Sequence, residues 1–127
     1  MTNGLKTVLV IDDDPGFQKS FSQKLKMMGF SVSVADTGSK AVETFSQNPN
    51  YFDLVVLDML MPDLDGTDIY ELIKIKNPDV RILFTSGVFD FDYLKNILQY
   101  GNIGFVIKPF NHDELQIQIS KVMNCAT

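Results

Sequence analysis

The chain has 127 residues, of which 45% are hydrophobic and 21% are charged, an ordinary composition for a globular domain. No stretch approaches the roughly 20 apolar residues of a membrane helix, and the net charge of −5 argues against direct binding to nucleic acid. No signal peptide precedes the first apolar run, and the single cysteine, Cys125, has no internal disulfide partner. We therefore expect one soluble, cytoplasmic domain over residues 1–127.

The first predicted strand is Thr7–Ile11, and a helix is expected from Asp14 to Gly29. Its apolar stripe consists of Phe17, Phe21, Leu25 and Met28. Asp14 stands before a proline, which is typical of an N-cap followed by a first-turn proline. The next predicted strand, Phe30–Ala35, alternates valines with serines, which favours the edge of a sheet. A helix over Thr37–Gln47 follows it.

The third predicted strand, Leu54–Leu57, is apolar at every position, as in a parallel sheet with helices on both faces. The later elements continue this alternation. The third helix is expected from Gly66 to Lys76, with the apolar positions Ile69, Leu72, Ile73 and Ile75. It is followed by a strand at Val80–Phe84, a helix from about Asp90 to Tyr100, a strand at Ile103–Ile107, and a last helix for which Asn111 and Glu114 resemble a capping box. Such βα units form an α/β fold in which the carboxyl ends of the strands share one edge.

Polar side chains follow four of the predicted strands: Asp12 and Asp13, Asp58, Ser86, and Lys108. Converging carboxylates repel one another unless a cation joins them, and Mg²⁺ suits a site of few oxygen ligands. Lys108 could pair with Asp58 at rest and with a phosphoryl group when one arrives. A carboxylate nucleophile held by a metal is the arrangement that forms an aspartyl phosphate. The edge therefore predicts a phosphoryl-accepting site.

Taken together, these motifs resemble the receiver domain of two-component response regulators. The resemblance rests on Asp12–Asp13, Asp58 with Met61–Gly66 after it, Ser86–Gly87, and Lys108–Phe110. It implies a doubly wound, flavodoxin-like (βα)5 fold whose parallel sheet has the order 2-1-3-4-5. It also implies a signalling module that assists its own phosphorylation and is not otherwise an enzyme.

The resemblance implies particular roles for the site residues. Asp58 would accept a phosphoryl group from a histidine kinase or phosphotransfer protein, and Ser86 and Lys108 would bind its oxygens. Mg²⁺ would be held by Asp13, Asp58, the main-chain carbonyl of Leu60, and Asp12 through a water molecule. Phe105 falls at the position of an aromatic switch, and the Lys108–Pro109 bond would be cis.

Two positions that influence hydrolysis in this family are apolar here, namely Leu60 and Val88. Neither side chain can orient an attacking water by a hydrogen bond, so the phosphorylated form should lose its phosphoryl group slowly. Phe105 lacks the hydroxyl of a tyrosine, so its switching would depend on packing alone.

Some positions leave alternatives open. Thr85 and Ser86 should point to opposite sides of their strand, and the motif favours Ser86 as the phosphate contact. Asp14 is read as a helix cap, Asp63 and Asp65 as turn residues, and His112 as a surface residue. In the fourth predicted helix the aromatic residues either fill gaps around the sheet or form a homodimer or effector surface, made of Tyr93, Ile97, Tyr100 and Phe105.

Three alternatives to a free-standing phosphoacceptor remain. The same receiver could be cut from a larger transcriptional regulator or hybrid kinase. A degenerate receiver would only bind partners, although the intact acidic residues argue against it. A small Mg²⁺-dependent phosphatase would need a second acid two residues after Asp58, where this chain has Leu60.

Overall fold

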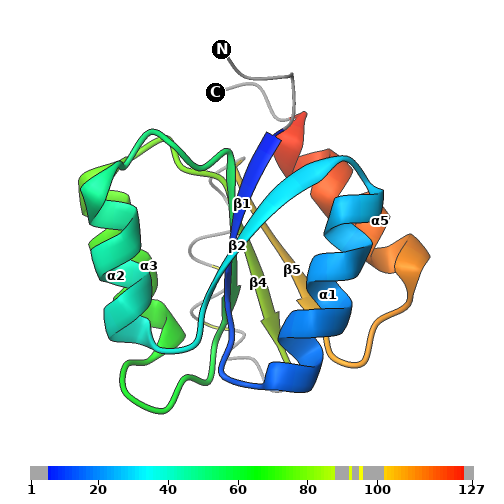
Figure 1. The fold of residues 1–127 in the computed structure, drawn as a ribbon, viewed down its shortest axis with the longest axis horizontal. Coiled ribbons are helices and arrows are strands. Elements are labelled where there is room, and N and C mark those ends of the chain that lie inside the picture. Colours follow the sequence, from blue (N-terminus) through cyan, green and yellow to red (C-terminus); the bar gives the residue numbers. More distant parts are fainter. Residues whose placement is uncertain (1–5, 88–91, 93–94, 96–101, 125–127) are drawn as a thin grey trace.

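The computed structural model describes residues 6–87, 92, 95 and 102–124. Its strands form one parallel sheet in the order β2-β1-β3-β4-β5, which confirms the expected topology. The strands are β1 (Lys6–Ile11), β2 (Phe30–Ala35), β3 (Leu54–Asp58), β4 (Ile82–Ser86) and β5 (Ile103–Ile107). The helices are α1 (Pro15–Met27), α2 (Gly38–Gln47), α3 (Gly66–Lys76) and α5 (His112–Met123) (Figure 1).

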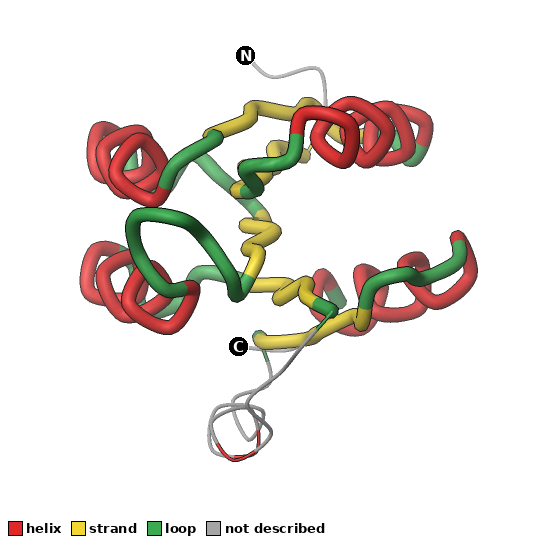
Figure 2. The backbone as a smooth tube through the Cα atoms, turned by 90° about the horizontal axis from the view of Figure 1, so that it is seen from below, coloured by secondary structure: helices red, strands yellow, loops and turns green. Residues whose placement is uncertain are grey.

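Two pairs of helices cover the two faces of this sheet. Helices α2 and α3 lie on one side, and α1 and α5 lie on the other, as the view onto the carboxyl edge shows (Figure 2). Alternate residues of a strand point to opposite faces, so in β1 Leu9 and Ile11 pack on one side while Val8 and Val10 pack on the other. Both faces therefore need apolar residues, which explains the continuous apolar runs.

Side-chain caps fix the starts of α1 and α5 at the carboxyl edge of the sheet. The Asp14 carboxylate accepts a hydrogen bond of 2.9 Å from the backbone N–H of Gly16 at the start of α1. At the start of α5, Asn111 and Glu114 form the reciprocal pair of a capping box, with bonds of 2.8 and 3.3 Å. Both predicted caps are confirmed, and they hold the two loops that carry Asp12 and Lys108.

The structure differs from the sequence pattern in two elements. Strand β4 begins at Ile82, because the backbone N–H of Val80 bonds to Asn77 in a turn. In α3 the buried face contains Ile69, Tyr70 and Ile73. Two apolar residues of the sequence pattern, Leu72 and Ile75, are instead 40% and 75% exposed. The ring of Tyr70 takes the inward position by packing 5.5 Å from that of Phe84.

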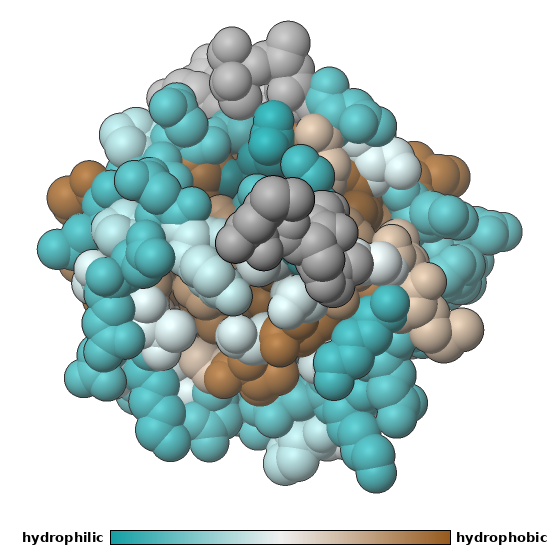
Figure 3. Space-filling model, turned by 45° about the horizontal axis from the view of Figure 1, so that its top comes forward, coloured by the Kyte–Doolittle hydropathy of each residue, from teal (hydrophilic) through white to brown (hydrophobic). Residues whose placement is uncertain are grey.

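The face of the molecule drawn in Figure 3 is mainly hydrophilic, with hydrophobic areas separated by polar ones. Within the described ranges, no helix has both the length and the apolar character that crossing a bilayer requires. The predicted helix at Asp90–Tyr100, and with it Tyr93, Ile97 and Tyr100, lies largely outside the described residues. Phe105 is half-buried in β5 and packs against the core on the α2 and α3 side.

Candidate functional site

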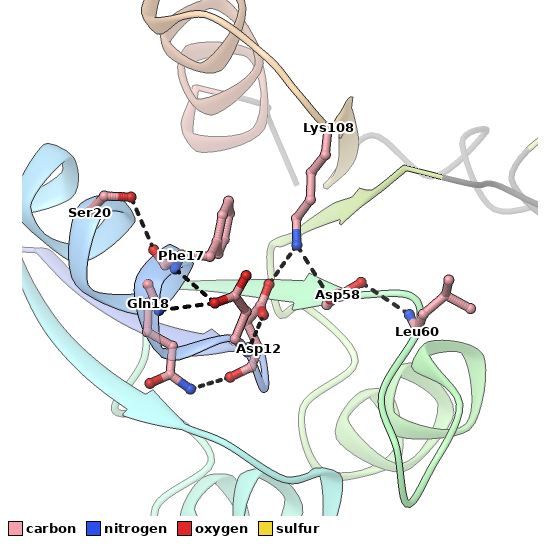
Figure 4. A network of polar contacts seen from close by, with 9 residues as sticks. Asp12, Phe17, Gln18, Ser20, Asp58, Leu60 and Lys108 are labelled. Carbon is pink, nitrogen blue, oxygen red and sulfur yellow. Dashed lines mark hydrogen bonds and ion pairs between the residues drawn. The ribbon is translucent and has the colours of Figure 1, made fainter.

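Three polar side chains from three strands meet at the carboxyl edge of the sheet. Asp12 follows β1, Asp58 ends β3, and Lys108 follows β5. The Lys108 Nζ lies 2.7 Å from an Asp12 carboxylate oxygen and 3.4 Å from an Asp58 carboxylate oxygen (Figure 4). Lys108 was expected to pair with Asp58, but its shorter ion pair is with Asp12, whose carboxylate is fully buried.

A third carboxylate completes an acidic cluster. Oxygen atoms of Asp12, Asp13 and Asp58 all lie within 4.8 Å of one another. Asp12 and Asp58 are buried, whereas Asp13 is exposed and leaves one side of the cluster open. Hard oxygen ligands at such distances suit a divalent cation that keeps part of its water shell. These residues therefore have the chemistry and spacing of a magnesium site.

Burial dominates the electrostatics of Asp58. It raises the pKa of the Asp58 carboxyl group above its ordinary value, and the nearby Asp12 raises it further. The 3.0 Å hydrogen bond from the Leu60 N–H and the charge of Lys108 act in the opposite direction but do not cancel the effect of burial. Negative charge on Asp58 is therefore costly unless a cation stands close by.

The pKa of Lys108 is also raised, although burial alone would lower it. The hydrogen bond to Asp12 and the charge of Asp58 are the main causes of the net increase. The pKa values of both partners of the 3.4 Å contact are thus raised, that of Asp58 mainly by burial and that of Lys108 by its two carboxylate neighbours. Lys108 remains a cation in this site.

Hydrogen bonds hold the loops around the carboxylates. One Asp12 oxygen accepts from the backbone N–H of Asp14 at 2.9 Å, and the Asp12 carbonyl accepts from the Gln18 side chain. Across the site, the backbone N–H of Gly66 donates to the Met59 carbonyl at 2.9 Å, which closes the loop after β3. Each carboxylate is therefore fixed by its own loop as well as by Lys108.

The end of β4 brings two buried hydroxyl groups to the same edge. Thr85 and Ser86 are each 1% exposed. The Ser86 carbonyl accepts a 2.8 Å hydrogen bond from the Lys108 N–H, which places the end of β4 beside the lysine loop. The Thr85 hydroxyl has no hydrogen-bond partner among the described residues. The Lys108–Pro109 peptide is cis, as expected, and Val88 lies outside the described residues.

Two residues contribute to the site in ways that sequence reasoning missed. The Lys108 Nζ lies 4.0 Å from the ring centre of Phe17, a residue that the sequence marked only as part of an apolar helical stripe. Asp63 links the loop after β3 to the start of α2 through three hydrogen bonds. Neither contact follows from spacing along the chain, because each joins elements that only the folded sheet brings together.

The Asp63 carboxylate accepts hydrogen bonds from the N–H groups of Gly38 and Ser39 at 2.8 and 3.0 Å, and from the Ser39 hydroxyl at 2.9 Å. The two backbone bonds are the main reason that the pKa of Asp63 is lowered to about 2. A carboxyl group with a depressed folded-state pKa stabilises the fold above its unfolded pKa, and this contribution disappears as the pH falls toward the folded value.

We expect Asp63→Asn to lower the thermal midpoint at neutral pH, because its amide NH2 would face a backbone donor. Wild type should lose this advantage between about pH 4 and pH 2, the interval between the unfolded and folded pKa values. Thermal melts of both proteins across this interval measure the effect. Asp65→Asn is the matched control, since Asp65 makes no side-chain cap bond. Equal midpoints of wild type and Asp63→Asn at pH 7 would contradict the prediction.

Comparison with known proteins places this geometry in a family. The model of the response regulator receiver domain matches residues 8–120, and the matched part contains all of the strand-end residues described above. The chain therefore belongs to the response regulator receiver domain family, whose members are phosphoacceptor modules of two-component signalling.

Relatives and solved structures agree with this assignment. The chain is 34% identical over 116 residues to the probable transcriptional regulator ycf27 of Guillardia theta, covering 91% of this chain and 44% of that protein. It is 32% identical over 117 residues to a cyclic di-GMP phosphodiesterase of Thermotoga maritima, covering 92% and 31%. The chain thus spans less than half the length of either relative.

Among solved structures, a receiver domain protein from Clostridium thermocellum has a TM-score of 0.85 and 30% sequence identity, with 94% of this chain and 95% of that chain covered. The CheX-CheY-BeF3-Mg²⁺ complex from Borrelia burgdorferi has a TM-score of 0.85 and 25% identity, with 94% and 90% covered. The flavodoxin-like receiver fold is therefore shared along nearly the whole chain.

Proposed function

We propose that Asp58 is the phosphoacceptor and that a histidine kinase or phosphotransfer protein supplies the phosphoryl group. The observation that carries this proposal is the buried Asp58 carboxylate within an acidic cluster, in contact with Lys108. In the transfer, the bond between phosphorus and the donor imidazole nitrogen breaks as a bond to an Asp58 oxygen forms. The electron pair of the broken bond stays with the imidazole.

Mg²⁺ is the cofactor that we propose for this cluster. Asp13, Asp58 and the main-chain carbonyl of Leu60 would hold it, and Asp12 would act through a water molecule. The bound ion would offset the negative charge of the phosphoryl oxygens. The fit is supported by three carboxylates whose oxygens lie within 4.8 Å of one another, beside Lys108, whose one positive charge does not balance their combined charge.

Lys108 and Ser86 would bind the phosphoryl oxygens. Lys108 already contacts Asp58 at 3.4 Å, so a phosphoryl group on that carboxylate would fall within reach of the ammonium group. Ser86 ends the strand that pairs with β5, and its carbonyl is bonded to the Lys108 backbone. Movement of Ser86 toward the phosphate would thus be transmitted to β5. Phe105, half-buried in β5, would respond by repacking, as an aromatic switch does.

Slow hydrolysis of the phosphorylated form is a further part of the proposal. The Leu60 side chain is 60% exposed, and an apolar group there gives an attacking water no hydrogen-bond partner. We expect Leu60→Asn to hydrolyse about tenfold faster or more, because its amide could orient the water.

The measurement is the loss of label from isolated phosphoprotein in Mg²⁺ buffer. Leu72→Asn is the control, since Leu72 is also exposed, at 40%, but lies on α3. Loss of label from wild type within seconds would contradict the prediction.

The proposed output is control of a partner or of an attached domain. The relatives named above include a transcriptional regulator and a phosphodiesterase, each more than twice the length matched here. The present chain would act as their receiver portion does, switching another activity and catalysing only its own phosphorylation. We propose a cytoplasmic location, in keeping with the absence of a membrane-crossing helix from the described ranges.

Acetyl phosphate tests the acceptor directly. Incubation of the chain with acetyl phosphate and Mg²⁺ should add the mass of one phosphoryl group, detected by intact mass spectrometry. Addition of beryllofluoride with Mg²⁺ should shift amide NMR signals near Asp58 and in β5. If neither the mass increase nor the NMR shifts were observed, the proposed phosphoacceptor role would be contradicted. The alternative of a degenerate receiver, which only binds partners, would then be favoured.

A further inference from the structure

The ammonium group of Lys108 has a third neighbour besides its two carboxylates. Its Nζ lies 4.0 Å from the centre of the Phe17 ring, and the lysine side chain is only 25% exposed. The face of an aromatic ring attracts a cation, and the attraction increases as water is excluded. The ammonium group is therefore held by Asp12, by Asp58 and by an aromatic face, as the close view shows (Figure 4).

The Phe17 ring is itself fixed by two other rings. It stacks on Phe21 with centroids 5.0 Å apart and an interplanar angle of 15°. The ring of Phe110 meets both edge-on, at 6.1 Å from Phe17 and 5.9 Å from Phe21. Phe21 is only 1% exposed and belongs to the core. Phe17 therefore cannot turn away from Lys108 without disturbing a packed cluster.

A cavity of about 370 Å³ adjoins this cluster, lined by Phe17, Ser20, Phe21, Lys24, Lys108, Pro109 and Phe110. Lys108 borders the cavity, so its long, flexible side chain has space into which it could move away from Asp58. Phe17 and Lys108 both line this cavity, so the Phe17 ring is the aromatic face that the ammonium group meets on this side. A smaller side chain at this position would remove the attraction and enlarge the space.

We propose that Phe17 is a positioning residue, whose ring face holds the Lys108 ammonium beside Asp58 for phosphoryl transfer. The proposal rests on the proposed role of Asp58 as acceptor. Phe17 would act through Lys108 and not on the reacting atoms themselves. Its contribution is to restrict a lysine that would otherwise sample many rotamers, which keeps the cation aligned with the reacting oxygen.

Two substitutions of Phe17 distinguish a role of its aromatic face from a role in packing alone. Phe17→Leu keeps an apolar side chain but has no ring, and we expect phosphorylation by acetyl phosphate to slow about 3- to 10-fold. Phe17→Trp supplies the ring with the strongest attraction for cations, and the adjoining cavity offers room for it. Its rate should stay within about twofold of wild type.

A second measurement is independent of phosphorylation. The ring current of Phe17 should displace the NMR signals of the Lys108 ε-methylene protons, and Phe17→Leu should return them to ordinary lysine values while Phe17→Trp keeps them displaced. Phe52→Leu is the matched control, because it removes a ring stacked at 6.2 Å and 15° on Phe45, on the other face of the sheet. It should lower stability but leave both the rate and the Lys108 signals unchanged.

The outcomes separate this inference from the proposed function. The positioning role would be overturned if Phe17→Leu were phosphorylated at the wild-type rate, or if Phe17→Trp were slowed as much as Phe17→Leu. Unchanged Lys108 NMR signals in Phe17→Leu would overturn it as well. If wild type itself accepts no phosphoryl group, the proposed function fails, and the Lys108 signals still decide whether Phe17 holds the ammonium group.

Discussion

Asp58→Asn should accept no phosphoryl group and should also be more stable than wild type at neutral pH without metal. An amide is too weak a nucleophile to form the acyl phosphate, so the mass increase with acetyl phosphate should disappear. Stability should rise because burial raises the pKa of Asp58, which means that its charged form is unfavourable in the fold. Lys108 keeps its 2.7 Å partner Asp12 in this variant.

The sign of the pH dependence follows from that raised pKa. A carboxyl group whose folded pKa lies above its unfolded value destabilises the fold as the pH rises through this interval, and it has no such effect below about pH 4. The unfolding free energy and the thermal midpoint of Asp58→Asn should therefore both exceed those of wild type at pH 7. The two midpoints should converge in acid.

Melts in EDTA buffer measure the difference, and added Mg²⁺ should stabilise wild type more than the variant. Continued phosphorylation of Asp58→Asn would place the acceptor elsewhere. A variant less stable than wild type at pH 7 would show that burial is not the dominant influence on this carboxylate.

Gly66→Ala should both destabilise the fold and impair phosphorylation. A Cβ atom at Gly66 would lie 2.6 Å from the Met59 Cα and 2.9 Å from the Asp58 carbonyl oxygen. These are backbone atoms at the end of β3, so they cannot rotate away as a side chain would. We expect a loss of about 1–3 kcal/mol in unfolding free energy, typical of overpacking. The rate of phosphorylation should fall as well, because relief of the clash moves Asp58.

Gly16→Ala provides the matched control for this substitution. Among the described residues, its added Cβ would meet the Asp14 side chain alone, at 3.4 Å, and alanine favours a helix by restricting the unfolded chain. Denaturant unfolding and phosphorylation by acetyl phosphate should show a protein at least as stable as wild type, with an unchanged rate. Wild-type stability in Gly66→Ala would mean that α3 can shift away from β3 without cost.

The sequence predicted those parts of the fold that depend on local pattern. Continuous apolar runs identified the central strands, and alternation identified β2 as an edge strand. The caps at Asp14 and Asn111 followed from residue type and spacing. The meeting of Asp12, Asp58 and Lys108 followed from topology, since parallel strands share one carboxyl edge. Family resemblance added the strand order and the cis peptide at Lys108.

Contacts between elements escaped prediction because spacing along the chain does not encode them. The preference of Lys108 for Asp12 over Asp58 depends on tenths of an ångström. The sequence identified Phe17 as a member of an apolar helical stripe, and only the structure shows that its ring lies against the Lys108 ammonium group. The inward turn of Tyr70 in α3, in place of Leu72, depends on the ring of Phe84 across the interface.

The ion pair between Asp12 and Lys108 joins residues that are 96 positions apart in the chain. Every strand that separates them in the sheet must be in register before the two side chains can meet. A partly folded chain, or one in which β5 has not yet docked, therefore has no working site. The pairing of Asp12 with Lys108 therefore makes the assembled site a property of the completed sheet and not of any one segment of the chain.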